Sequence, residues 1–233
     1  MQIKKEHEIV SKARGDRIRK KNPNDIAHKL GVDDRYFISH NSMQRLDNGR
    51  WLNDKIINFY MKLLEIYSAE HTDMKVKCQK SYFMEKILPR ADDEIYYDYE
   101  AIKRWMRERV EEFDIILYPI NIVQQHWALA VVYTNAKRIQ YYDSDGENRD
   151  LYLRTLRMYI HDHGDRNEWE LVSDAHLGPQ QTNGFDCGVF VCISAFWIIN
   201  GKTPSYNQRY IRHNGRSSIR QSIETEKLVA VEF

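Results

Sequence analysis

The apolar residues of this chain fall into short blocks, and each block repeats with the period of one kind of secondary structure. Between residues 51 and 67 they recur every three or four positions, which places them on one face of an amphipathic helix. Asn53 or Asp54 can cap the start of that helix, because either side chain accepts a hydrogen bond from a free N–H group of the first turn. A second helical pattern covers residues 99–110, where four large apolar residues share one side: Ile102, Trp105, Met106 and Val110.

Three later segments are rich in β-branched and aromatic residues and predict strands. They are residues 114–122, 126–134 and 138–144. Pro119 lies inside the first of them and predicts an edge position or a bulge, since proline cannot donate a hydrogen bond to a neighbouring strand. Asn135 and its neighbours provide the turn between the second strand and the third.

The most hydrophobic block lies near the end of the chain. A helical pattern near residues 151–161 is followed by a strand and an irregular loop over residues 170–184. Residues 187–199 come next, and they are apolar on every side. A helix with no polar face must be buried all round. The alternation of helices with a short run of strands predicts an α+β fold over residues 26–233, with a small, mostly antiparallel sheet and a central buried helix.

Residues 1–25 differ from the rest of the chain, because they are rich in lysine and arginine and contain few large apolar side chains. We interpret them as a basic N-terminal arm. The cluster over residues 17–21 fits a nuclear-import signal or a contact with a polyanion, although a solvated charged surface is the more common use of such a run.

Charge and cysteine usage exclude several classes of protein. The 35 basic and 34 acidic residues nearly cancel, so no net field favours nucleic acid or an anionic membrane. Three cysteines without a CxxC pair argue against a disulfide framework and against a cysteine-rich zinc site. The sequence has no secretory signal and no run of about 20 apolar residues. We expect an intracellular monomer of the nucleus or cytoplasm that needs no metal or cofactor.

Three reactive side chains lie at the ends of predicted elements. His126 opens one strand and Asp143 closes the next, so a hairpin can bring the two residues side by side. The carboxylate could then hold the imidazole in one tautomer. Cys187 begins the buried helix, where partial positive charge and a nearby imidazolium favour the thiolate over the thiol.

Taken singly, each of these residues more often has a structural role. A lone cysteine beside an apolar helix is usually a packing residue, which is how we interpret Cys78 and Cys192. A histidine before a strand is usually a hydrogen-bonded structural residue, and an aspartate after a strand often forms a turn. Zinc binding by the same three residues is disfavoured, because they lack the paired spacing of zinc ligands.

Five segments together resemble one family. In chain order they are WLNDKIINFYMKLLE, IKRWMRERV, PINIVQQHWALAVVY, YYDSDG and GPQQTNGFDCGVFVC. From Trp51 to its end, the chain resembles the ubiquitin-like-protein-specific cysteine proteases, the SUMO proteases above all. The resemblance implies a thiol protease or isopeptidase that cuts after the C-terminal Gly-Gly of its modifier, in precursor maturation, in deconjugation from lysine, or in both.

The resemblance also implies a role for each of nine residues. The catalytic residues are the nucleophile Cys187, the base His126, the orienting acid Asp143 and the oxyanion donor Gln181. The residues that bind the modifier are Trp51 and Trp127, which line a tunnel over its tail, and Asp54, Tyr82 and Phe83, which contact its surface. Capping explains Asp54 equally well, a bond to its own loop is the alternative for Gln181, and core packing is the alternative for all four aromatic residues.

Other functions fit parts of the same pattern. The modifier could be ubiquitin or another relative of SUMO. Bacterial effectors of the same clan use a similar set of three residues to transfer acetyl groups, and a non-catalytic module could bind modifiers on the same surface. Gln181 and Trp127 favour peptide cleavage over acetyl transfer, because an acetyltransferase needs no tunnel for a Gly-Gly tail.

Overall fold

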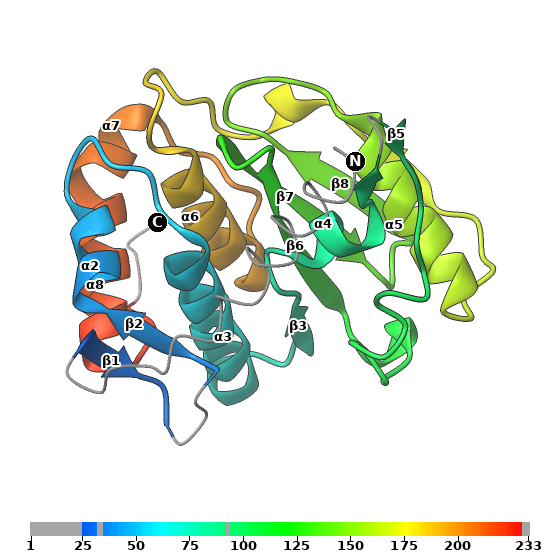
Figure 1. Cartoon of the computed structure of the whole chain (residues 1–233), viewed down its shortest axis with the longest axis horizontal. Helices are drawn as coiled ribbons and strands as arrows, with labels where there is room; N and C mark the ends of the chain where they lie inside the picture. The colour runs from blue at the N-terminus through cyan, green and yellow to red at the C-terminus, as the bar shows by residue number, and fades with distance from the viewer. Residues whose placement is uncertain (1–24, 32–34, 92–93, 230–233) are drawn as a thin grey trace, which may run out of the picture.

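The computed structural model describes residues 25–31, 35–91 and 94–229. A five-stranded sheet forms its middle, in the order β3-β6-β7-β8-β9 (Figure 1). The strands are β3 Val76–Cys78, β6 Ile115–Ile122, β7 His126–Tyr133, β8 Arg138–Tyr142 and β9 Glu170–Val172. The basic arm predicted for residues 1–25 lies outside the described residues, apart from Asp25.

The two long central pairings of this sheet, β6 with β7 and β7 with β8, are antiparallel. The two short outer pairings, β3 with β6 and β8 with β9, are parallel. The predicted α+β class and the three consecutive strands are therefore confirmed, and the sheet is mixed because a parallel strand is added at each edge.

Pro119 lies in an internal strand and pairs with Leu129 in an unbroken register, which differs from the edge position or bulge predicted for it. The pairing of β6 with β3 ends where Cys78 lies opposite Leu117, and the N–H group of Gln79 donates to the Leu117 carbonyl just beyond. Proline therefore comes after the neighbouring strand has ended, where its missing N–H group leaves no ladder bond unmade on that side.

Helices cover both faces of the sheet (Figure 1). The two on one face are α3 Asp54–His71 and α6 Cys187–Ile199, and the two on the other are α4 Phe83–Ile87 and α5 Asp150–Asp162. Each face of the sheet therefore has its own hydrophobic core. Along β6, Ile115 and Leu117 pack in the core with α3 and α6, and Ile116 and Tyr118 pack in the core with α4 and α5. Burial on both sides explains why β6 and β7 are apolar at nearly every position. The predicted helices over α3, α5 and α6 are confirmed, and every residue of α6 is buried.

The helix predicted over residues 99–110 is wrong. This segment is a series of turns, with bonds from Ile102 N–H to the Tyr99 carbonyl and from Trp105 N–H to the Ile102 carbonyl, each spanning three residues. Ile102, Met106 and Val110 are buried as their spacing suggested, but Trp105 is 36% exposed. Near the end of this segment a side chain competes for the backbone, because the Glu108 carboxylate accepts from the N–H group of residue 107.

Smaller elements complete the described chain. Near the start lie β1 Ile26–Lys29, β2 Phe37–Ser39, α2 His40–Met43 and a 3₁₀ turn over Gln44–Leu46. Between α4 and α6 lie β4 Arg90–Ala91, β5 Glu94–Ile95 and 3₁₀ turns over Val110–Glu112 and Ala175–Leu177. After α6 come α7 Gln208–Tyr210, a π turn over Ile211–Gly215 and α8 Arg216–Thr225. Within the described ranges, no helix combines the length and the hydrophobicity needed to cross a membrane.

Candidate active site

The ends of β7 and β8 bring a histidine and a carboxylate together. His126 is the first residue of β7, and Asp143 directly follows β8, which runs antiparallel to β7. The Nε2 atom of His126 lies 2.6 Å from Oδ1 of Asp143, a short distance typical of a charge-assisted hydrogen bond. The pairing expected from a hairpin is present in the structure.

Asp143 is a buried carboxylate whose oxygens are both hydrogen-bonded. Besides His126, its Oδ1 atom accepts from the N–H group of Asp145 at 2.9 Å, and its Oδ2 atom accepts from the hydroxyl of Tyr141 at 3.1 Å. These bonds offset the cost of burying a charge, since the residue is only 2% exposed. Tyr141 was not predicted from the sequence, although side chains two positions apart in a strand, such as those of Tyr141 and Asp143, point to the same side.

Cys187 is the first residue of α6 and lies against the histidine. It is 3% exposed, and its sulfur lies near enough to His126 to raise the pKa of the imidazole. The sulfur therefore lies at the N-terminal end of a thirteen-residue helix, where the partial positive charge of the helix favours an anion. The position predicted for this cysteine is confirmed.

The protonation of His126 reflects competing influences. Burial lowers the pKa of His126, but the hydrogen bonds and negative charges of Asp143 and Cys187 outweigh burial and raise it to about 10. The imidazole is therefore protonated at neutral pH. An imidazolium next to a cysteine favours the reactive thiolate over the thiol and can act as a proton donor.

Gln181 is fixed by the segment that follows the acid. Its N–H group donates to the Ser144 carbonyl at 2.7 Å, and its side-chain oxygen accepts from the Ser144 hydroxyl at 2.8 Å. Its Nε2 atom donates to the Asn183 carbonyl at 2.6 Å, which is the local bond considered as an alternative to the oxyanion role. A carboxamide nitrogen carries two hydrogens, so one such bond leaves a second donor for a ligand. Ser144 was missed by the sequence analysis.

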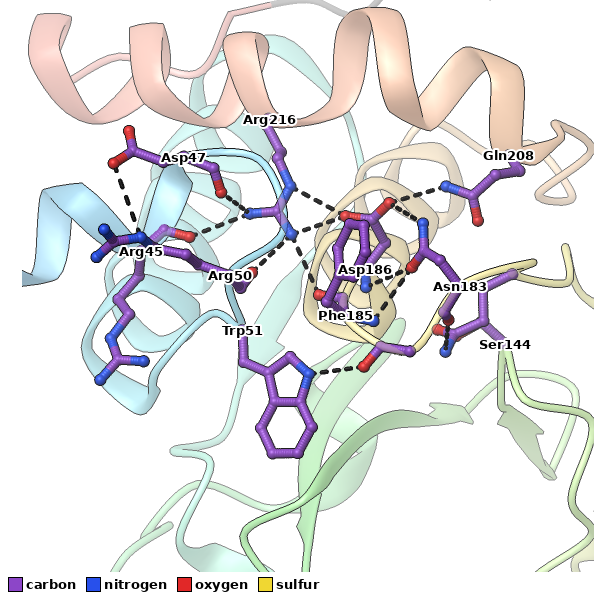
Figure 2. Close-up of polar contacts among 12 residues, drawn as sticks. Arg45, Asp47, Arg50, Trp51, Ser144, Asn183, Phe185, Asp186, Gln208 and Arg216 are labelled. Atoms are coloured by element: carbon purple, nitrogen blue, oxygen red, sulfur yellow. Dashed lines mark hydrogen bonds and ion pairs between the residues drawn. The ribbon is translucent and has the colours of Figure 1, made fainter.

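Both tryptophans that are expected to line a substrate tunnel lie close to the start of α6. Trp51 is 43% exposed, and its indole N–H group donates to the Gly184 carbonyl at 2.6 Å (Figure 2). Trp127 is 4% exposed, and its indole N–H group donates to the Leu52 carbonyl at 2.9 Å. A Cβ atom added to Gly188 would lie 3.2 Å from the Trp127 ring, so the ring contacts the first turn of α6.

The residues predicted to contact the modifier's surface are not equivalent. Asn53 caps α3, because its Oδ1 atom accepts from the N–H group of Ile56, and this leaves the exposed Asp54 free of the capping role. Tyr82 is 41% exposed, and it lines a hollow of about 720 Å³ together with Asp54. Phe83 is 1% exposed and packs edge-on against Tyr118, so its ring belongs to the core and is not accessible to a partner.

Comparison with known proteins identifies the family. The sequence model of the Ulp1 protease family, C-terminal catalytic domain, matches residues 50–230. The chain belongs to this family. Its Ulp1-type fold also matches the C-terminal Ulp1 protease domain solved in complex with Smt3, the yeast ortholog of SUMO. The TM-score is 0.72 and the identity 27%, over 97% of this chain and 96% of that one.

Curated relatives of the Ulp1 family give the same result. The chain is 33% identical to human sentrin-specific protease 2 over 181 residues, which cover 73% of this chain and 29% of that protein. It is 29% identical to a sentrin-specific protease of Caenorhabditis elegans, over 83% of this chain and 28% of that protein. The chain thus spans less than a third of the length of these relatives, and the similarity concerns a cysteine peptidase catalytic domain.

In the part of the chain that the structure describes, no group of three or more histidine, cysteine, aspartate or glutamate side chains is arranged to hold a metal ion. The three cysteines are all free thiols. Burial raises the pKa of Cys192, and burial together with the nearby Glu65 carboxylate raises that of the partly buried Cys78, which favours the protonated thiol at both positions.

Proposed function

We propose that this chain is a cysteine protease and isopeptidase that cuts after the C-terminal Gly-Gly of a ubiquitin-like modifier, with SUMO as the preferred modifier. One observation carries the proposal: a buried helix begins with Cys187, beside a histidine that is hydrogen-bonded to Asp143. The match of residues 50–230 to the Ulp1 family supports the reaction, and the relatives named for SUMO and sentrin support the substrate.

The reaction starts with attack by the Cys187 thiolate on the carbonyl carbon of the last glycine. The negative charge that develops on the carbonyl oxygen is stabilised by the N–H group of Cys187 and by the free hydrogen of the Gln181 amide. The His126 imidazolium then gives its proton to the departing nitrogen, which is a lysine amine or a peptide nitrogen.

A thioester between Cys187 and the modifier remains after the amine departs. His126, now neutral, takes a proton from a water molecule, and the resulting hydroxide attacks the thioester carbon. The thiolate leaves, the modifier is released with a free carboxylate, and the enzyme returns to its starting state. Asp143 keeps one ring nitrogen of His126 occupied through the cycle, so the proton moves on the side that faces the sulfur.

Substrate selection follows from the residues around the sulfur. We assign Trp51 and Trp127 to the channel over the extended tail, where glycine fits because it has no Cβ atom. Asp54 and Tyr82 are assigned to the modifier's folded surface, for which their exposure and their shared hollow are the support. Phe83 is left out of this assignment, because it is buried. We also propose an address in the nucleus or cytoplasm, where thiols stay reduced.

The test is a panel of ubiquitin-like proteins with electrophilic C-termini, incubated with the enzyme and read by intact-protein mass spectrometry. We expect a covalent adduct with SUMO, located on Cys187 by peptide mapping and absent from Cys187→Ser. Cys192→Ser is the matched control, because it removes a buried thiol from the same helix and should keep the adduct. An adduct with ubiquitin alone would change the modifier, and a lack of any adduct would contradict the proposal.

A further inference from the structure

Arg216 lies at the first position of α8, far along the chain from the residues of the active site, yet it reaches the loop before Cys187 (Figure 2). Its side chain is only 11% exposed. The Nε and Nη2 atoms both donate to Oδ1 of Asp186, at 2.9 and 2.7 Å. A buried arginine and carboxylate thus meet directly beside the nucleophile.

Asp186 immediately precedes α6, but its carboxylate makes no capping bond to the helix. An aspartate at this position usually accepts from an N–H group of the first turn. Here the second carboxylate oxygen accepts instead from the amides of Asn183 and Gln208, each at 2.8 Å. The charge of Asp186 is therefore turned toward Arg216, and the first turn of α6 is left uncapped at the site where a thiolate and an oxyanion form.

The same guanidinium also contacts a second segment of the site. Its Nη1 atom donates to the carbonyls of Arg45 and Asp47, both at 3.0 Å, and its Nη2 atom donates to that of Arg50 at 2.7 Å. Nη2 also donates to the Phe185 carbonyl at 3.1 Å. All three nitrogens of one side chain are used to join residues 45–50 to residues 185–186.

These two segments carry the walls of the candidate tail channel. Trp51 directly follows Arg50, and its indole N–H group donates across to Gly184, three residues before the nucleophile. The only side chain drawn in Figure 2 that contacts both segments at several points is Arg216. The guanidinium suits this task, because its rigid fork of five N–H donors fixes partners in directions that a lysine ammonium cannot reproduce.

We propose that Arg216 is a positioning residue that holds Trp51 at a fixed separation from Cys187, so that the channel over the substrate tail has a set width. The proposal rests on the proposed function. Arg216 itself touches neither the sulfur nor the tail; it acts through the backbone of residues 45–50 and through Asp186.

Arg220 provides a matched control on the same helix. It lies one turn further along α8, and its Nη2 atom contacts the same segment through the Asp47 carboxylate at 3.0 Å and the Met43 carbonyl at 3.4 Å. Its side chain is 35% exposed, and it does not reach Asp186. A surface ion pair of this kind contributes little, so Arg220→Lys should leave cleavage within about twofold of the wild type.

Two variants test Arg216. Arg216→Lys keeps the positive charge opposite Asp186 but loses the fork. The double variant Arg216→Met with Asp186→Asn removes both charges together, so that no unpaired charge is left buried and the chain keeps its fold. We expect kcat/KM on a SUMO fusion with a Gly-Gly junction to fall by roughly 10–100-fold in both variants, because a misplacement of about 1 Å at a reacting centre has effects of this size.

A spectroscopic readout separates positioning from general stability. The five tryptophans are replaced by 5-fluorotryptophan, and the Trp51 resonance is assigned in the ¹⁹F NMR spectrum by its loss in Trp51→Phe. In Arg216→Lys the Trp51 signal should shift or broaden, while the signal of Trp169, in the core on the other side of the sheet, should stay in place. Arg220→Lys should move neither signal.

Several outcomes would overturn the proposal. One is a Trp51 signal unchanged in Arg216→Lys, whatever happens to the rate. Another is a double variant with wild-type kcat/KM, since Arg216 would then serve only to neutralise Asp186. If the wild type cuts no modifier but the Trp51 signal moves in Arg216→Lys alone, the proposed function fails while the link from Arg216 to Trp51 stands.

Discussion

At the scale of single residues, the proposed chemistry depends on one imidazole that lies between the Asp143 carboxylate and the Cys187 side chain. The carboxylate of Asp143 is held by Tyr141 and by a backbone N–H group, so it cannot turn away from His126 when the ring gains or loses its proton. In the proposed mechanism the ring therefore keeps one orientation in the attack, proton-transfer and hydrolysis steps, as expected beside an orienting acid.

Replacing Asp143 with asparagine should lower kcat by roughly 10²–10⁴-fold, because the ring loses its fixed tautomer. The pH profile should also change. Since Asp143 raises the pKa of His126, its removal lowers that pKa, and the imidazolium is lost at a lower pH. The alkaline limb of kcat/KM against pH should therefore move to lower pH in Asp143→Asn. A limb that stays in place would show that it reports another group.

The Gln181 amide and the Ser144 hydroxyl are hydrogen-bonded to each other, and substitutions can separate the contributions of the two residues to the rate. Gln181→Ala removes a donor to the oxyanion, so kcat should fall by about 10–10³-fold with little change in KM. Ser144→Ala keeps that donor and removes only the hydroxyl that fixes the amide oxygen, so the fall should be smaller. Steady-state kinetics on a Gly-Gly fusion measure both. A rise in KM at unchanged kcat would assign Gln181 to binding instead.

At the scale of elements, the close contact between the start of α6 and the residues ahead of α3 decides where Trp127 lies. Gly188 is in the first turn of α6, and a Cβ atom there would lie 3.0 Å from Cβ of Leu52 and 3.2 Å from Cδ1 of Trp127. Glycine is favoured at this position because the Leu52 and Trp127 side chains lie close to its Cα atom, and not because of its backbone angles.

Gly188→Ala should therefore displace Trp127 and lower the stability of the chain by about 1–3 kcal/mol, the usual effect of overpacking a core. Gly184→Ala is the matched control, because nothing lies within 4 Å of a Cβ atom added there. Thermal unfolding of both variants measures the difference. Equal melting temperatures for the two variants would show that Leu52 and Trp127 can move aside at little cost.

Elements with one unbroken pattern were predicted well from the sequence, and elements formed by long-range contacts were not. The apolar run that begins at Cys187 could only be a buried helix, and its residues are indeed buried. The spacing of Ile102, Met106 and Val110 imitates a helix, but these residues are buried from separate turns. The proposed catalytic residues were predicted from strand ends and a family motif. Arg216 was missed, because no local pattern links it to Arg45, 171 positions away.

At the scale of the whole molecule, the two hydrophobic cores, one on each face of the sheet, fix the relative positions of Cys187, His126 and Trp127. Cys187 and Trp127 belong to the core that contains α3 and α6, and His126 lies at the end of a strand that faces both cores. Several segments of the chain form the proposed channel. Substrates with an altered tail therefore test it more directly than the substitution of one side chain.

Modifier variants that end in Ala-Gly should be cut far more slowly than Gly-Gly, with the loss in kcat/KM, because a Cβ atom in the tail would collide with a ring of the channel. Trp127→Ala should not restore the wild-type rate for the Ala-Gly tail, because an opened channel no longer holds the scissile carbonyl near Cys187. Alkylation of Cys187 by iodoacetamide should persist in this variant. Equal cleavage of the two tails by the native enzyme would contradict the channel.

The position of Arg216 also has a consequence for how the chain becomes active during synthesis. Its contacts with the carbonyls of Arg45, Asp47 and Arg50 span 166 to 171 residues, so they cannot form until α8 has been made and has left the ribosome. Contacts of such long range form late and slowly. A partly synthesised chain that already contains Cys187 and His126 would thus lack a finished channel. In refolding experiments, we expect far-UV circular dichroism to recover before peptidase activity does.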